Sequence, residues 1–522
     1  MAYKSFIFIM FLLFYQNFFA SLNLLSQDKS EKIDVLKYYI RISINFDLRN
    51  IECDNDITIK MSNAFLDTIE LDFYNNLTIT SISVDSFLLP YKRGNKKIFI
   101  DVSSVKSDSF SINIKYKGRP KSFGLEGFVF AEFNNQKIIQ TVNQPNYAPS
   151  WIPCNDIPSD KALLEIEIIN DSDFVSVSNG KLMCEKKIEN KILHHYKTFY
   201  PISTNLIGIY SANYRIHYDE YLSINNNYIP IEFYFFQQDS QKVLNDLKSI
   251  KDYLMTFEKL FGEYPFIQEK FSISEILLGR GGIENQTLIG ISRDLFSGKN
   301  LHENIFIHEI AHNWWGNSVG IHNWEDIWLS EGFATYSEAL YYEHNYGKDA
   351  LKAFMEKLKI NEYSGTLNNP KNLFGNTVYN KGAWVLHMIR GVLTDSLFFQ
   401  FLKNYYNQFK YSSISTINFK EYLETFTKKD FTEFFNDWVY NDNGIIDCKY
   451  HFNNNVLTIY QSKYVFNFSV EIGIIFTDGT FETLIENVNT KEYQKKFNFT
   501  KEVNKILIDP NIKLLSNFEE IN

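Results

Sequence analysis

Two histidines four residues apart, His308 and His312, are the side chains in this sequence best spaced to hold a metal ion. Because residues i and i+4 share one face of a helix, a helix over 305–316 would point both imidazoles at a single ion. Glu309 follows the first histidine directly, so it projects beside the pair and can take a proton from metal-bound water. Glu331 can supply the third protein ligand of a catalytic tetrahedral site. The pattern predicts one zinc ion per chain.

Two helices joined by a turn are needed to position these side chains. Eighteen residues separate His312 from Glu331, which is enough for a turn through 317–326 and the start of a second helix in W-L-S-E. The alternative is a pair of ordinary surface or core histidines, but a chance H-E-x-x-H with the correctly spaced glutamate is rare in a chain with ten histidines. His194 and His195 are adjacent and cannot share a helix face, so we expect them in a strand or loop.

Length and charge limit the classes of function. A chain of 522 residues is long enough for several domains, each with its own core. Its formal net charge of -10 and its lack of a long basic run argue against a nucleic-acid partner. The four cysteines are few and far apart, so we predict no disulfide, and the metal site requires none of them.

Residues 1–20 are predicted to be a signal peptide. Lys4 precedes an apolar run from Phe6 to Tyr15, and Ala20 follows at a suitable cleavage region. We therefore expect an exported protein in the periplasm, the cell envelope or the medium, with no stable membrane association once the segment is removed. An uncleaved anchor is the alternative, although the run is short for a membrane span.

Changes of hydrophobic period divide the chain into three regions. Residues 30–216 alternate apolar and polar positions, which is typical of half-buried strands. Helical spacing dominates 217–440, beginning with a helix predicted from about 239 to 261 that ends before a glycine. Period two returns over 441–522, where Asp478-Gly479 favours a hairpin turn. The expected fold is a multidomain α+β protein with a helical catalytic region between two β-domains.

With the metal motif placed, further segments show that the sequence resembles the M1 family of zinc aminopeptidases over most of its length. H-E-I-A-H-N-W-W-G-N and W-L-S-E-G-F-A match the family's metal motif. The family's G-x-M-E-N motif resembles residues 281–285, with Ile283 in place of methionine. V-Y-N-K-G-A-W-V-L is similar to the stretch with the family's catalytic tyrosine, here Tyr379. Q-P-N-Y-A-P-S-W-I-P-C-N-D resembles the segment with a substrate-lining glutamine, here Gln144.

The resemblance implies a fold and a set of site residues. The fold would be a saddle-like N-terminal β-domain, a thermolysin-like catalytic domain and a small C-terminal β-sandwich, a short form lacking the large C-terminal helical domain of many members. Glu309 and Tyr379 would be catalytic. The residues implied in substrate binding are Gln144, Gly281, Gly282, Glu284 and Asn285.

The resemblance implies an aminopeptidase acting on peptides with free N-termini. Glu284 would bind the α-ammonium, and the glycines at 281 and 282 would let an extended peptide approach the backbone. Three alternatives stay open, namely an endopeptidase of related type, a non-catalytic peptide-binding homologue and a lipid-processing hydrolase. The third is disfavoured because Lys371 occupies the position of an aspartate that a lipid-epoxide-hydrolysing relative uses.

Overall fold

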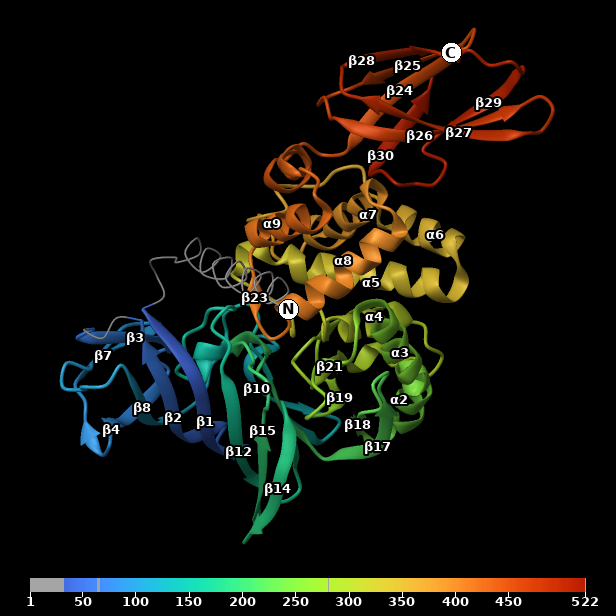
Figure 1. Cartoon of the computed structure of the whole chain (residues 1–522). Coiled ribbons are helices and arrows are strands. Elements are labelled where there is room, and N and C mark those ends of the chain that lie inside the picture. The colour runs from blue at the N-terminus through green and yellow to red at the C-terminus, as the bar shows by residue number, and fades with distance from the viewer. Residues whose placement is uncertain (1–31, 63–65, 280, 522) are drawn as a thin grey trace, which may run out of the picture.

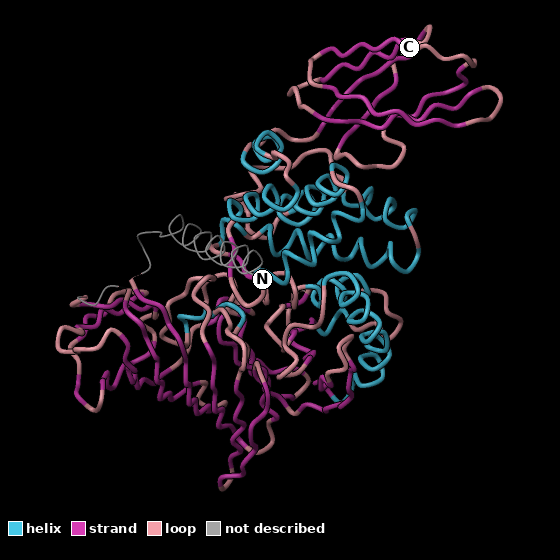
Figure 2. Tube along the Cα trace, in the orientation of Figure 1, coloured by secondary structure: helices cyan, strands magenta, loops and turns pink. Residues whose placement is uncertain are grey.

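The computed structural model describes residues 32–62, 66–279 and 281–521, so the predicted signal peptide lies outside the described residues. The N-terminal region consists mainly of strands, the middle region mainly of helices and the C-terminal region of strands (Figure 1). This order agrees with the changes of hydrophobic period in the sequence. Figure 2 shows the helical layer lying between the two strand-rich ends. Within the described ranges, no helix is both long enough and apolar enough to span a bilayer.

The N-terminal region is built on an eight-stranded sheet with alternating buried positions. Ile40, Ile42 and Ile44 are completely buried on one face, because side chains along a strand point alternately to its two faces. Strand β1 pairs in parallel with β12 and antiparallel with β2. The spatial order of the sheet is β14 (Lys181–Ile188), β15 (Lys191–Lys197), β12 (Leu163–Asp171), β1 (Ile33–Asn45), β2 (Asn50–Met61), β8 (Ser109–Gly118), β4 (Leu77–Val84) and β5 (Phe87–Leu88).

A second N-terminal sheet carries the strand that leads to the predicted site. Its spatial order is β13 (Val175–Ser178), β16 (Ile209–Ala212), β11 (Gln136–Val142), β10 (Glu126–Phe133) and β9 (Ser122–Phe123). The chain leaves β11 and reaches Gln144 two residues later. A small third sheet contains β3 (Thr68–Asp72), β7 (Lys97–Asp101) and β6 (Tyr91–Arg93).

The middle region begins after β16, where the chain leaves the second N-terminal sheet and enters another sheet as β17. Its five-stranded sheet has the order β17 (Tyr214–Leu222), β18 (Tyr228–Phe236), β19 (Phe271–Ile276), β21 (Ile289–Ser292) and β20 (Gly282–Ile283). Strand β20 is therefore an edge strand. The α-helices are α2 (Ser240–Asp246), α3 (Ile250–Phe261), α4 (Glu303–Ala311), α5 (Trp328–Tyr346), α6 (Lys348–Leu358), α7 (Gly382–Val392), α8 (Asp395–Phe409), α9 (Thr416–Thr427) and α10 (Thr432–Phe435).

Short elements connect these helices. A π-helix at Thr377–Lys381 leads directly into α7, and another at Asn436–Tyr440 follows α10. Strand β22 (Gly320–Ile321) follows the metal motif and pairs in parallel with β23 (Ser413–Ile414). This pair ties the segment after α4 to the chain between α8 and α9.

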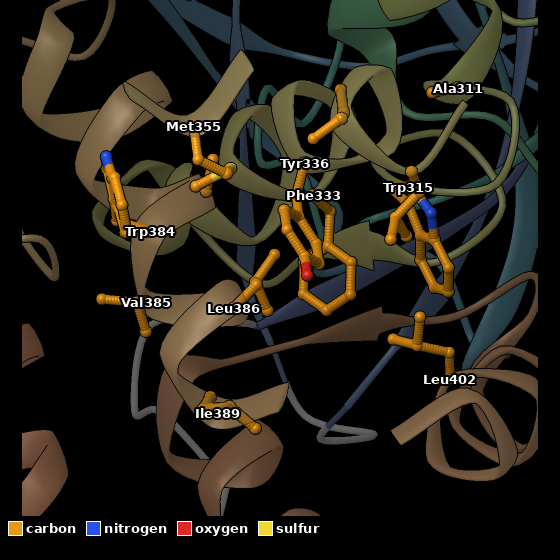
Figure 3. Close-up of a cluster of buried hydrophobic side chains, with 14 of the residues drawn as sticks. Ala311, Trp315, Phe333, Tyr336, Met355, Trp384, Val385, Leu386, Ile389 and Leu402 are labelled. Atoms are coloured by element: carbon orange, nitrogen blue, oxygen red, sulfur yellow. The ribbon is translucent and has the colours of Figure 1, made fainter. Parts of the chain in front are cut away.

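An aromatic core fixes the helices behind the metal motif (Figure 3). Trp315 follows α4, and its ring lies 4.8 Å from that of Phe333 on α5 and 5.9 Å from that of Tyr405 on α8. Trp315 and Trp384 are almost completely buried. Burial of this many large side chains stabilises the relative positions of α4, α5, α7 and α8.

Two small sheets form the C-terminal region. One has the order β28 (Glu492–Lys496), β25 (Val456–Gln461), β24 (Ile446–Asn453) and β30 (Ser516–Glu520), and the other has the order β27 (Phe481–Val488), β26 (Phe468–Phe476) and β29 (Val503–Ile508). The predicted turn Asp478-Gly479 joins β26 to β27, and Gly479 has a φ of +80° there.

The single helix predicted from about 239 to 261 is interrupted in the structure. Helix α2 ends at Asp246, a 3-10 turn follows at Leu247–Ser249, and α3 continues to Phe261. The Asp246 carboxylate accepts backbone N–H groups from Ser297, Gly298 and Asn300. The break therefore coincides with a contact to a distant loop, which the local helical period cannot predict.

Candidate metal centre and active site

Helix α4 and the following residue bring both histidines to one point. The helix ends at Ala311, earlier than the predicted 316, but His312 keeps helical backbone angles as its cap. The Nε2 atoms of His308 and His312 lie 3.1 Å apart, and each lies 3.3 Å from Oε2 of Glu331 on α5. A tetrahedral zinc ion with bonds of 2.0–2.2 Å separates its ligand atoms by about 3.3–3.6 Å. The three side chains fit such an ion.

The other ring nitrogen of each histidine has its own partner. His308 Nδ1 lies 2.9 Å from Oε1 of Glu338, and His312 Nδ1 lies 3.0 Å from the carbonyl oxygen of Trp315. Partners of this kind fix the tautomer and the ring plane, so that both Nε2 atoms are presented to a metal. Gly316 leaves room for this arrangement, because a Cβ there would lie 2.3 Å from Ser330 Oγ and 3.2 Å from His312 Nδ1.

Glu309 lies beside the candidate metal ligands, against strand β20. Its side chain is buried, and among the described residues its Oε2 has no hydrogen-bond partner. Burial raises the pKa of the Glu309 carboxyl to about 7, even though the two neighbouring histidines lower it. A carboxyl that titrates near neutrality can both accept and release a proton.

The carboxylate of Glu284 lies close to Glu309 and the candidate metal ligands. Its carboxylate, that of Glu309 and a His312 nitrogen all have ligand atoms within 4.8 Å of one another. Gln144 Nε2 donates to Glu284 Oε1 at 2.6 Å across 140 residues of sequence. Asn317 Nδ2 donates to the Glu284 backbone carbonyl at 2.7 Å, which connects this segment to the turn after α4.

Tyr379 lies on the π-helix that precedes α7. Its ring stacks near His308 with 5.8 Å between centroids. Burial raises the pKa of its phenol well above the ordinary value, and Glu331 and Glu284 raise it further. The hydroxyl is therefore protonated at neutral pH and can donate a hydrogen bond.

These groups surround a single cavity of about 700 Å³ between the second N-terminal sheet and the helical region. Nine of the ten predicted site residues line it, namely Gln144, Gly281, Gly282, Glu284, His308, Glu309, His312, Glu331 and Tyr379. Asn285 does not. It is completely buried, and its Nδ2 donates to the hydroxyl of Tyr210 at 2.8 Å, behind the cavity wall.

The sequence interpretation omitted several residues that the structure places here. Glu338 lies seven positions after Glu331 on α5, so helical spacing could have identified it as a partner on the same face. Asn317 and Glu126 carry no such local signal, because each reaches the site through a contact between distant segments. Lys371 also lines the cavity.

Comparisons with known families agree with this geometry. The model described as "Peptidase M1 N-terminal domain" matches residues 35–206. The model described as "Peptidase family M1 domain" matches residues 247–438, which include all three candidate metal ligands. Together the two matched segments cover more than half of the chain.

Two curated relatives of the chain are named aminopeptidases. A probable aminopeptidase 2 of Sulfurisphaera tokodaii is 24% identical over 78% of this chain and 54% of its own length, and a glutamyl aminopeptidase of Bos taurus is 26% identical over 58% and 34%. The chain thus spans about half or less of the length of these curated relatives.

Two solved structures share the fold. The aminopeptidase A of Legionella pneumophila, in complex with aspartic acid, has a TM-score of 0.84 at 17% identity and covers 95% of this chain and 61% of its own. An M1 zinc metallopeptidase of Deinococcus radiodurans has a TM-score of 0.67 at 20% identity over 79% and 95% of the two chains. With the two family models matched in order along the sequence, this chain belongs to peptidase family M1.

Proposed function

We propose that this chain is a zinc-dependent aminopeptidase that removes single residues from the free N-terminus of peptides. The observation that carries the proposal is the short distance, within one cavity, between Glu284 and the groups proposed for zinc binding and proton transfer. Glu284 lies within 4.8 Å of Glu309 and His312. That separation corresponds to one amino-acid residue between a bound α-ammonium and the bond to be cut.

His308, His312 and Glu331 would hold the zinc ion. When bound, zinc acts as a Lewis acid that polarises the scissile carbonyl and makes a bound water a stronger acid. The spacing of the three donor atoms and the hydrogen bonds to the outer histidine nitrogens support this assignment. The donor set has two imidazole nitrogens and one carboxylate oxygen. It therefore differs from the sulfur ligands that favour copper and from the all-oxygen sets that favour magnesium.

The remaining side chains divide the chemistry. Glu309 accepts a proton from the attacking water and passes it to the leaving amine, because its buried carboxyl lies beside the three candidate ligands. Tyr379 donates its phenolic proton in a hydrogen bond to the oxygen that becomes negatively charged. Glu284, supported by Gln144, binds the ammonium. Strand β20 lies at the edge of its sheet, where an extended peptide could pair as an additional strand.

Acetylated and free peptides provide the main test. Acetylation removes the substrate charge and leaves the Glu284 carboxylate buried without its partner, a penalty of about 2–5 kcal/mol. The ratio of kcat/KM between free and acetylated peptide should therefore be on the order of thirtyfold to several thousandfold in the wild type. Glu284→Gln keeps the shape of the side chain and should reduce this ratio to near one. Equal cleavage of both peptides by the wild type, or release of internal fragments first, would instead favour an endopeptidase.

Metal analysis tests the ligand assignment separately. Glu331→Ala should lose tightly bound zinc, because only two protein ligands remain. Glu309→Gln should keep a full equivalent of zinc while kcat falls by several orders of magnitude, because the base is lost and the coordination is intact. Full zinc occupancy in Glu331→Ala would contradict the assignment.

Export is a separate proposal, supported by the apolar segment after Lys4. Mass spectrometry of the mature protein should detect a new N-terminus between about Ala20 and Gln27. A mature chain that retains Met1 in a soluble intracellular fraction would contradict it.

A further inference from the structure

Lys371 is the only lysine or arginine among the described residues that line the catalytic cavity. The same wall contains five glutamates, namely Glu126, Glu284, Glu309, Glu331 and Glu338. The proposed function and the hydrogen bond from His308 to Glu338 account for four of them. A lone cation in so acidic a cavity has no part in metal binding, proton transfer or ammonium binding.

The Lys371 ammonium is available to a ligand. Its side chain is 72% exposed, and its Nζ lies 3.9 Å from Oδ2 of Asp442, which is beyond hydrogen-bond distance. That carboxylate oxygen already accepts the backbone N–H of Gly365 at 2.9 Å. A lysine carries three donors, so this weak ion pair leaves the ammonium free to bind an anion in the cavity.

Two backbone hydrogen bonds anchor the loop that carries Lys371 to the helical region. Leu367 N–H donates to the carbonyl of Val439 at 3.0 Å, and Asn369 N–H donates to the carbonyl of Glu325 at 2.8 Å. Gly365 has a φ of +83°, and a Cβ there would lie 3.2 Å from Lys371 Cγ. The backbone therefore holds the base of the lysine in place, while its long side chain can extend into the cavity.

A chain of contacts joins this loop to the segment that supports Glu284. The ring of Phe374, another lining residue, lies 6.5 Å from that of Trp324. Trp324 Nε1 donates to Oδ1 of Asn146 at 2.9 Å. Asn146 follows Gln144 by two residues, and Gln144 binds Glu284. The loop from 371 to 374 thus borders the part of the cavity in which the first residue of a bound peptide would lie.

We propose that Lys371 binds a carboxylate of the peptide substrate and thereby favours peptides that begin with aspartate or glutamate. The inference rests on the proposed function, because it requires a peptide whose α-ammonium is held by Glu284. Apart from the candidate metal ligands, Lys371 is the only basic side chain among the described lining residues, so selection for a substrate carboxylate depends on this lysine. A short peptide could also present its C-terminal carboxylate, but the position beside the Gln144 segment favours the side chain of the first residue.

Matched peptides separate the two sources of the carboxylate. Glu-Ala-Ala-amide and Gln-Ala-Ala-amide differ only in the charge of the first residue, and Gln-Ala-Ala with a free or amidated end differs only at the C-terminus. Each pair is assayed with the zinc-loaded wild type, Lys371→Met and Lys371→Glu. Lys348→Met is the control, because Lys348 is similarly exposed at 76%, has a similarly weak pair at 3.7 Å with Asp395, and does not line the cavity.

In the wild type, kcat/KM for the Glu peptide relative to the Gln peptide should exceed the same ratio in Lys371→Met by about twofold to fivefold, the size expected for an exposed ion pair. Lys371→Glu should lower the ratio of kcat/KM for the Glu peptide to that for the Gln peptide below its value in Lys371→Met, whereas Lys348→Met should keep the wild-type ratio. A change confined to the free and amidated pair would overturn the preference for a first aspartate or glutamate and assign the C-terminal carboxylate as the ligand.

Two further results would overturn the inference, and only one of them would also refute the proposed function. Unchanged ratios for both pairs in Lys371→Met, with neutral peptides still cleaved by the wild type, would remove Lys371 from substrate binding and leave the proposed function intact. Failure of the zinc-loaded wild type to cleave any of these peptides would refute the proposed function, and the role of Lys371 would fall with it.

Discussion

A methyl group added at Gly282 provides a direct test of the position of the proposed base. A Cβ at Gly282 would lie 2.5 Å from Cδ, 2.6 Å from Cγ and 2.7 Å from Oε1 of Glu309. Non-bonded carbon atoms prefer about 3.5–4.0 Å, so the carboxyl group must move by about 1 Å. The φ of Gly282 lies outside the left-handed region, so alanine causes no backbone strain there.

A displacement of about 1 Å in a catalytic group can reduce the rate by about a hundredfold, because proton transfer requires hydrogen-bond geometry. Gly282→Ala should therefore lower kcat by about two orders of magnitude. Zinc content should remain at one equivalent, since the methyl group is directed at Glu309 and not at the three ligands. Steady-state kinetics on a free peptide and metal analysis of the same preparation measure both quantities.

Gly279→Ala is the matched control for this substitution. Among the described residues, a Cβ at Gly279 would meet no atom within 4 Å, and the φ of Gly279 is not in the left-handed region. Gly279 precedes the same strand by three residues. Its kcat should remain within about twofold of wild type. A kcat for Gly282→Ala within threefold of wild type would show that the Glu309 carboxyl can move without loss, and would refute the proposed role of its position.

Three further predictions concern other parts of the molecule. Tyr379→Phe should lower kcat by about two to three orders of magnitude with little change in KM, the usual loss for one oxyanion donor, and a near-normal kcat would assign the tyrosine to packing alone. Lys161 Nζ donates to the backbone carbonyls of Asn317, Ser318 and Ser412 at 2.7, 3.0 and 3.1 Å. Lys161→Met should therefore lower the free energy of unfolding by about 2–4 kcal/mol, because it removes these bonds. An unchanged midpoint of urea unfolding would contradict this prediction. Burial lowers the pKa of His387 from 6.5 to about 4, so the unfolded chain takes up a proton between these values that the folded chain refuses. Stability should thus be full above pH 6.5 and fall by on the order of 3 kcal/mol by pH 4, and His387→Gln should lose less over the same range in urea unfolding.

Residues close in sequence were the most predictable part of the site. The two histidines and Glu309 occupy one turn, so the geometry of a helix alone places them correctly. The strands were predictable for the same reason, since alternation in β1 and β26 follows directly from the pleat. Each of these features depends on a spacing of a few residues, which the covalent chain imposes wherever it folds.

Contacts between distant segments were decided by the tertiary structure. The hydrogen bond from Gln144 to Glu284, the position of Lys371 in the cavity and the burial of Asn285 behind it all depend on how the N-terminal sheets lie against the helical region. A periodic pattern in the sequence does not predict such a contact. Its two partners belong to different elements, and the apolar face of each element could be buried in many relative orientations. The sequence by itself thus determined the types and local spacing of the candidate metal-binding and catalytic groups. Only the packing of the domains, through the summed burial of many side chains, decided which other groups face them.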